Sequence, residues 1–133
     1  MILVDTSAWI EYLRATNSPE HRTLRSLIER DAPLATTDPV VMELLAGARD
    51  DARLMALRRF ILRFEHVPTQ GLADYEAAAE LYRRCRRAGT TPRSLMDCLV
   101  VRVALREDIP LLARDRDFER IAAVTGARMY RDG

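Results

Sequence analysis

Residues 2–7 of the chain read Ile2-Leu3-Val4-Asp5-Thr6-Ser7, an aliphatic run that ends at a carboxylate and two hydroxyls. Three apolar residues are too few for a helix and are typical of a buried strand, while Asp, Thr or Ser directly afterwards favours the start of a helix. Four more short apolar runs follow along the chain, separated by longer stretches with helical period. Short buried strands that alternate with helices indicate an α/β fold with a central parallel sheet.

The whole chain divides into five predicted strands with helices between them. The strands are expected at residues 2–4, 33–36, 66–68, 110–113 and 128–130. The helices are expected at residues 6–17, 19–28, 40–46, 51–64, 72–88 and 93–107, and from residue 117 onward. The helix at 72–88 is expected to turn these side chains toward the core: Tyr75, Ala78, Ala79 and Tyr82. No repeat, low-complexity segment or flexible linker interrupts this order, so we predict a single domain over residues 1–133.

Composition excludes several enzyme classes. All 21 basic residues are arginine, against 20 acidic residues, so the chain has no lysine. P-loop NTPases, Schiff-base enzymes and protein kinases each need a lysine and are excluded. The net charge of +1 argues against duplex DNA or an anionic membrane as the dominant partner. No apolar stretch is long enough to span a membrane, and the first residues do not resemble a signal peptide, so we expect a soluble, cytoplasmic protein.

Two carboxylates stand directly after predicted strands. Asp5 follows the first strand and Asp115 follows the fourth, with Asp117 two residues further on. In α/β folds, ligands bind at the carboxyl ends of the parallel strands. Asp5 is therefore a candidate site residue, although a cap on the helix that follows it explains the residue equally well.

Glu43 is the only charged residue between Pro39 and Gly47. A helix that is apolar on nearly every face is buried, and a buried carboxylate requires a cation, hydrogen bonds or a proton. No arginine stands three or four residues away to pair with it. We therefore expect Glu43 at the site. The alternative is an exposed glutamate on a short surface helix.

Asp97 lies in an apolar segment that runs from Ser94 to Val101. Ser94 and Asp97 match a capping box, in which Asp97 would only complete the start of the helix. Thr91-Pro92 is the stronger start signal, because proline favours the first helical position. A start there would place Asp97 in the second turn, free to serve a site, and this is the interpretation that we favour.

Carboxylates on two strand ends and two apolar helices can meet at one edge of the sheet. Adjacent anions raise one another's proton affinity unless a cation lies between them. Oxygen ligands without a histidine or cysteine cluster select Mg²⁺ or Mn²⁺ rather than zinc. Such an ion activates water and stabilises the charge on a scissile phosphate. The acids therefore predict metal-dependent cleavage of a phosphodiester.

Four segments in this order resemble the PIN-domain ribonucleases, and within them the VapC-type toxins of bacterial toxin–antitoxin pairs. The segments are Ile2-Leu3-Val4-Asp5-Thr6-Ser7, Val41-Met42-Glu43-Leu44-Leu45, Arg93-Ser94-Leu95-Met96-Asp97-Cys98 and Arg114-Asp115-Arg116-Asp117-Phe118. The resemblance covers essentially the whole chain. It implies a PIN-like fold and a Mg²⁺- or Mn²⁺-dependent endoribonuclease that acts on transfer RNA or another structured RNA.

The resemblance also implies roles for residues and partners. The acidic catalytic and metal-binding quartet is matched by Asp5, Glu43, Asp97 and Asp115. Asp117 would be an accessory ligand, while Thr6 would position water or phosphate and Arg93 the substrate. A small antitoxin of the VapB type is expected to cover the acidic site, and the toxin is expected to form a homodimer.

Arginines concentrate in the segment around Asp97. Residues 81–106 hold seven arginines against one acid. Because the planar guanidinium group suits phosphate, four of them form a candidate RNA-binding strip: Arg83, Arg84, Arg86 and Arg87. The alternative is a solvated helix face in which Glu80 pairs with Arg84.

Two other functions fit the same residues. A non-catalytic RNA- or protein-binding α/β module would use the acids only as caps and solvated charges. A structure-specific nuclease would use them on DNA. Saturable manganese binding that depends on Asp5 would exclude the first alternative, and cleavage of flapped DNA would support the second.

Overall fold

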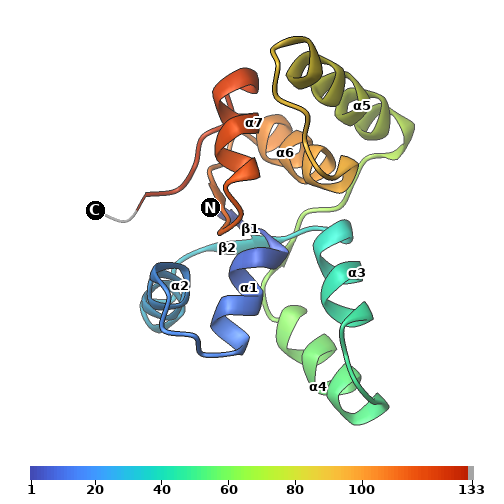
Figure 1. Ribbon diagram of the computed structural model, residues 1–133. Coiled ribbons are helices and arrows are strands. Elements are labelled where there is room, and N and C mark those ends of the chain that lie inside the picture. Colours follow the sequence, from blue (N-terminus) through green and yellow to red (C-terminus); the bar gives the residue numbers. More distant parts are fainter. Residues whose placement is uncertain (132–133) are drawn as a thin grey trace.

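The computed structural model describes residues 1–131 and contains a parallel sheet with helices on both sides (Figure 1). Within these residues four strands lie in the order β3-β2-β1-β4. Their bounds are β1 Ile2–Val4, β2 Leu34–Thr36, β3 Glu65–His66 and β4 Leu111–Leu112. All three strand pairings are parallel. The predicted α/β class is confirmed, and the carboxyl ends of all four strands lie along one edge.

The fifth predicted strand, at residues 128–130, is reduced to a single parallel bridge. Met129 is bridged to Leu111, and Tyr130 N donates to Leu111 O at 2.8 Å. The chain therefore runs alongside β4 in the predicted direction, but only one residue pairs. The prediction of five strands is wrong by this one strand, because a single bridge is too short to count as a strand.

Helices account for most of the remaining chain up to residue 131. Seven are found there: α1 Thr6–Leu13, α2 Pro19–Glu29, α3 Asp38–Ala46, α4 Asp51–Ile61, α5 Gly71–Arg87, α6 Leu95–Glu107 and α7 Asp117–Thr125. In Figure 1, α5, α6 and α7 gather on one side of the strands, and α1, α2 and α4 on the other. The remaining helix, α3, joins the two groups, because it contacts α1 and α4 on one side and α6 on the other.

The hydrophobic core lies on both faces of β1, whose three residues are all buried. On one face, Trp9 of α1 is fully buried and packs against Phe60 and Phe64, with ring centroids 5.6 and 4.9 Å away. Phe118 of α7 is also fully buried. A strand that is covered on both faces reads as a continuous apolar run, which is why residues 2–4 indicated a strand so clearly.

The start of α6 differs from our preferred prediction. The helix begins at Leu95 and not at residue 93, and Ser94 is its N-cap, with its Oγ accepting from Met96 N at 3.1 Å. Asp97 consequently lies in the first turn, as the capping-box interpretation required. The hydroxyl of Ser94 satisfies a free N–H of the helix start, which the proline signal at Pro92 cannot do.

The inward face of α5 was predicted only in part, since Ala78 is buried and Tyr82 packs against the core, whereas the other two residues are exposed. Tyr75 is 55% exposed, and Ala79 is exposed as well. The residues that face the core are Asp74, Ala78, Leu81 and Cys85. Both sets repeat with helical spacing, so periodicity alone could not choose between them. Burial of the Asp74 carboxylate decides the rotation of the helix.

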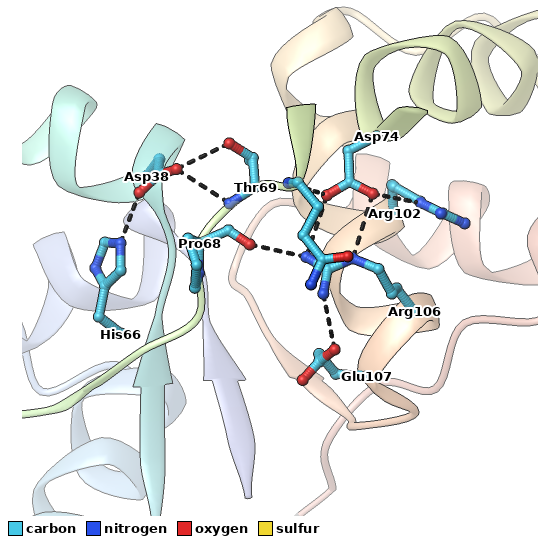
Figure 2. Close-up of polar contacts among 9 residues, drawn as sticks. Asp38, His66, Pro68, Thr69, Asp74, Arg102, Arg106 and Glu107 are labelled. Atoms are coloured by element: carbon cyan, nitrogen blue, oxygen red, sulfur yellow. Dashed lines mark hydrogen bonds and ion pairs between the residues drawn. The ribbon is translucent and has the colours of Figure 1, made fainter. Parts of the chain in front are cut away.

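Asp74 is fully buried and holds three elements together (Figure 2). Its carboxylate accepts hydrogen bonds from Arg102 Nε at 2.8 Å, Arg106 Nη2 at 3.1 Å and Gln70 N at 2.8 Å. Arg106 Nη2 also donates to the carbonyl of Pro68 at 2.8 Å. Burial alone would raise the pKa of Asp74, but these hydrogen bonds outweigh it and lower the pKa below 3.8.

Asp38, in the first turn of α3, binds the same connection from the other side (Figure 2). Its Oδ1 lies 2.6 Å from His66 Nε2, and its Oδ2 accepts from Thr69 N at 3.0 Å and Thr69 Oγ1 at 2.8 Å. The connection from β3 to α5 is therefore fixed to α3 and α6.

Among residues 1–131, no helix is both long and apolar enough to cross a membrane.

Candidate functional site

Asp5 lies at the carboxyl end of β1, and the interpretation of it as a helix cap is confirmed. Its side chain is the N-cap of α1, since Oδ2 accepts from Ser7 N at 2.9 Å. The residue is also 4% exposed. Burial raises the pKa of the Asp5 carboxyl from 3.8 to about 6, although the Ser7 hydrogen bonds lower it. A cap does not need such a buried position, so Asp5 remains a site candidate.

Glu43 is exposed, which contradicts the expectation of a buried carboxylate. The helix α3 is not covered on every face, because Met42 beside it is 53% exposed. The exposed-helix alternative was therefore correct about burial. Glu43 nonetheless points to the site, because its Oε1 accepts from Thr6 Oγ1 at 2.9 Å. Thr6 in turn directly follows Asp5.

Asp97 has the most perturbed acidity of these carboxyls. Burial, followed by the negative charges of four other residues, raises its pKa from 3.8 to about 7. Those four residues are Asp5, Asp115, Asp117 and Glu43. Every other carboxylate predicted for the site therefore acts on Asp97 through its charge, which requires that all five lie in one region.

Asp115 and Asp117 are both engaged by Arg93, through different groups. Asp115 Oδ1 accepts from Arg93 Nη2 at 2.9 Å and from Asp117 N at 3.0 Å. Asp117 is 2% exposed, and its Oδ2 accepts from Arg93 N at 2.8 Å. Asp117 thus fixes the backbone before α6, while Asp115 pairs with an arginine whose side chain is 73% exposed.

The predicted site residues therefore converge at the carboxyl edge of the sheet. As they stand, no three His, Cys, Asp or Glu side chains within residues 1–131 are close enough together to hold a metal ion. Their chemistry fits a hard divalent cation, because all the candidate donors are oxygens. Burial is the largest cause of the raised pKa values of Asp5 and Asp97, and the charges of neighbouring acids raise both further.

Sequence reasoning missed two features at this edge. Ser7 Oγ accepts from Arg114 N at 2.9 Å, which joins the start of α1 to the end of β4. Thr36 and Thr37, at the end of β2, are fully buried and their hydroxyls have no partner among the described residues. A hydroxyl two residues after Asp5 was visible in the sequence, but its contact across the sheet was not.

The arginine strip on α5 is mostly engaged within the protein. Arg83 and Arg87 pair with Glu80 at 3.2 and 3.0 Å. Arg84 does not pair with Glu80 as the alternative proposed, since its Nη2 donates to the carbonyl of Val124 at 3.2 Å. Arg86 lies over the ring of Tyr82, 5.9 Å from its centroid. One of the four arginines is therefore bound to α7, and the others pair with residues of α5 itself.

The fold and the site together define an α/β protein with an acidic site at the carboxyl edge of its parallel sheet. The model of the PIN domain family matches residues 2–124. Ribonuclease VapC11 of Mycobacterium tuberculosis is 42% identical over 126 residues, which cover 94% of each chain. The chain therefore belongs to the PIN domain family and, within it, to the VapC ribonucleases.

Solved structures share the fold at lower identity. VapBC2 from Rickettsia felis, bound to a DNA fragment from its promoter, has a TM-score of 0.76 at 16% identity over 98% of both chains. VapC20 of Mycobacterium tuberculosis, described as a sarcin-ricin loop cleaving toxin, has a TM-score of 0.71 at 24% identity. That alignment covers 96% of this chain and 99% of VapC20. At these identities the likeness establishes the fold alone.

Proposed function

We propose that this VapC ribonuclease is a toxin that uses Mg²⁺ or Mn²⁺ to cut transfer RNA or another structured RNA internally. The observation that carries the proposal is the convergence of four carboxylates on Asp97, whose pKa is raised to about 7. In a chain of the PIN domain family, such an accumulation of negative charge is best explained by a cation that it is built to hold. The non-catalytic module is disfavoured, because caps and solvated charges do not need to converge.

The residues proposed to hold the cation are Asp5, Asp97, Glu43 and Asp115. When bound, the ion would lower the pKa of a water molecule and offset the charge on the scissile phosphate. Ser7 N holds one oxygen of Asp5, and Thr6 Oγ1 holds one oxygen of Glu43. These two hydrogen bonds orient the carboxylates before any ligand arrives.

We infer that Asp115, rather than Asp117, is the direct ligand. Both Asp117 oxygens already have partners, Oδ2 at Arg93 N and Oδ1 at Arg120 Nη1, 3.7 Å away. Asp117 is therefore suited to orient the loop that carries Arg93. The Arg93 guanidinium group is mostly exposed beside Asp115, so it can transfer from that carboxylate to a phosphate oxygen of RNA.

We further propose two protein partners. The Rickettsia felis neighbour is a VapBC complex, and an antitoxin of the VapB type would neutralise this chain by covering the acidic site. A second copy of the chain would cover the apolar surface on α5 and α6, where Leu72, Tyr75 and Leu95 are 71%, 55% and 60% exposed. Exposed apolar residues in such a group commonly mark a protein interface.

The test is RNA cleavage by purified protein that has been freed of any antitoxin. Cellular RNA is incubated with manganese or with EDTA, and the new 5′ ends are mapped by sequencing. We expect defined cuts in manganese, none in EDTA, and none with Asp97→Ala. Calorimetric titration with manganese should show saturable binding that is lost in Asp5→Asn. Equal cleavage in EDTA would exclude the metal-dependent mechanism.

A further inference from the structure

An open hollow of about 450 Å³ lies directly beside the acidic site. It is lined from α1 by Ser7, Ile10 and Glu11, and from the segment after β4 by Arg114, Asp115 and Arg116. Its volume is within the range of about 300–1,000 Å³ that is usual for ligand pockets. The hollow is connected to the acidic site in two ways. Asp115 belongs to both the hollow and the site, and Ser7, which lines the hollow, donates its backbone N–H to Asp5.

The polar wall of this hollow is preorganised. Arg114 Nη1 donates to Glu11 Oε1 at 2.7 Å, and Glu20 holds the same guanidinium group at 3.9 Å. Thr16 Oγ1 donates to Glu11 Oε1 at 2.8 Å and lowers the pKa of that carboxyl. Glu11 is therefore a fixed, ionised acceptor whose side chain is 15% exposed. The side chain of Arg114, which ends in a planar guanidinium group, is 49% exposed.

The wall residues match the parts of a ribonucleotide. A guanidinium plane and an aliphatic side chain are surfaces on which an unpaired RNA base stacks, and Arg114 and Ile10 supply them. The exposed Arg116 stands at the same wall and can pair with a phosphate. A carboxylate can only accept hydrogen bonds, so Glu11 favours a base with an exocyclic amino group. Uracil is disfavoured because its N3–H lies between two carbonyl oxygens that the carboxylate repels.

We propose that this hollow binds the nucleotide next to the scissile phosphate and selects a base that carries an exocyclic amino group, with Glu11 as the selecting residue and Arg116 as the phosphate contact. The proposal rests on the proposed function, because it names a subsite for the RNA that the acidic site cuts. An RNA substrate explains the position of the hollow. The nucleotide next to the one at the scissile phosphate must lie beside the acidic site, and the hollow lies there.

The first test measures binding in the non-cleaving Asp97→Asn protein. The probes are short homopolymeric RNAs of cytidine, adenosine and uridine, and anisotropy gives their affinities. We expect oligocytidine and oligoadenosine to bind about tenfold more tightly than oligouridine. Adding Glu11→Gln should remove most of this difference in affinity. The glutamine side chain should stay in place, because Thr16 can still donate to its amide oxygen. Adding Arg116→Glu should weaken all three probes and reduce the salt slope by about one.

Arg59→Glu is the matched control, because this exposed arginine on α4 lies outside the hollow and undergoes the same change of charge. If Glu11→Gln keeps the full preference, or if Arg116→Glu binds RNA no worse than Arg59→Glu, the subsite is wrong. It is also wrong if Arg116→Glu abolishes binding of a co-expressed protein partner and leaves RNA binding intact, because the hollow would then serve that protein.

The second test uses protein that retains Asp97 and maps its cut sites on an RNA of randomised sequence. We expect an amino-bearing base beside the cut, and a loss of this preference in Glu11→Gln with cleavage retained. Unchanged cut sites in Glu11→Gln would overturn the subsite and leave the ribonuclease function standing. Absence of any cleavage, together with the expected binding pattern, would overturn the proposed function, and the hollow would then be a base-selective RNA-binding site without a cut beside it.

Discussion

Asp97 is the residue whose charge state should affect stability most clearly. Its pKa is about 7 in the folded protein and 3.8 ordinarily, so the folded chain binds more protons between these values. Stability contributed by this carboxyl is therefore complete below about pH 4 and is lost as the pH rises through about 7. The loss arises because neutral pH forces a charge into a half-buried position among other anions.

We therefore predict that Asp97→Asn stabilises the metal-free protein at about pH 8, by on the order of 2 kcal/mol after allowance for solvent screening. The gain should shrink as the pH falls and vanish near pH 4. Urea unfolding in EDTA at several pH values measures it. Asp51→Asn, at an exposed position on α4, is the control and should show no such trend. A gain that is independent of pH would contradict the predicted charge repulsion.

Thr6 provides a second prediction, about orientation rather than charge. Its hydroxyl donates to Glu43 at 2.9 Å, and valine has the same shape without the hydroxyl. Thr6→Val should lower single-turnover RNA cleavage by about tenfold or more, because Glu43 is no longer held in position. Unfolding free energy should fall by only about 1 kcal/mol. Thr6→Ser keeps the donor and should restore cleavage, and failure of this rescue would exclude the orienting role.

The sequence indicated which acids gather at the candidate site better than it indicated the burial of each one. The charges of the four other acids all reach Asp97, because their positions after strands and on adjacent helices follow from the parallel order of the fold. The burial of Glu43 was wrong, since an apolar sequence does not reveal that Met42 and its neighbours face solvent.

Within the elements, the start of a helix and the face that it buries were the uncertain points. Two start signals competed before α6, and the hydroxyl of Ser94 prevailed because it satisfies a backbone donor directly. On α5, two sets of residues had the same spacing. The choice depended on Arg102 and Arg106, two arginines of another helix, and no periodicity within α5 could reveal them.

Asp74 should be a strong determinant of stability at the level of these elements. Asp74→Asn would leave Arg106, whose side chain is only 13% exposed, with the more exposed Glu107 as its remaining counter-charge. We expect a loss of about 3 kcal/mol in unfolding free energy, measured in urea at neutral pH. Asp108→Asn removes an exposed partner of Arg128 and should cost less than about 1 kcal/mol. A similar cost for both variants would show that Arg102 and Arg106 find other acceptors.

Across the whole molecule, the two groups of helices leave different surfaces for partners. The acidic site lies at the carboxyl edge of the sheet and draws residues from α1, α3, α6 and the segment after β4 (Figure 1). The apolar surface lies on α5 and α6, where Tyr75, Leu95 and Met96 line a hollow of about 180 Å³. Since Asp97 and Leu95 share the first turn of α6, a partner on the apolar surface would also support the site.

The final prediction concerns this apolar surface as a homodimer interface. Tyr75→Arg combined with Leu95→Arg places charges where two copies would meet, and each charge would lose its hydration there. Light scattering after size exclusion should show a dimer for the original chain and a monomer for the double variant. Met55→Arg is the control, because Met55 is 53% exposed on α4, on the other side of the sheet, and should leave the dimer intact. A dimer that survives the double variant, or dissociates equally in the control, would place the interface elsewhere.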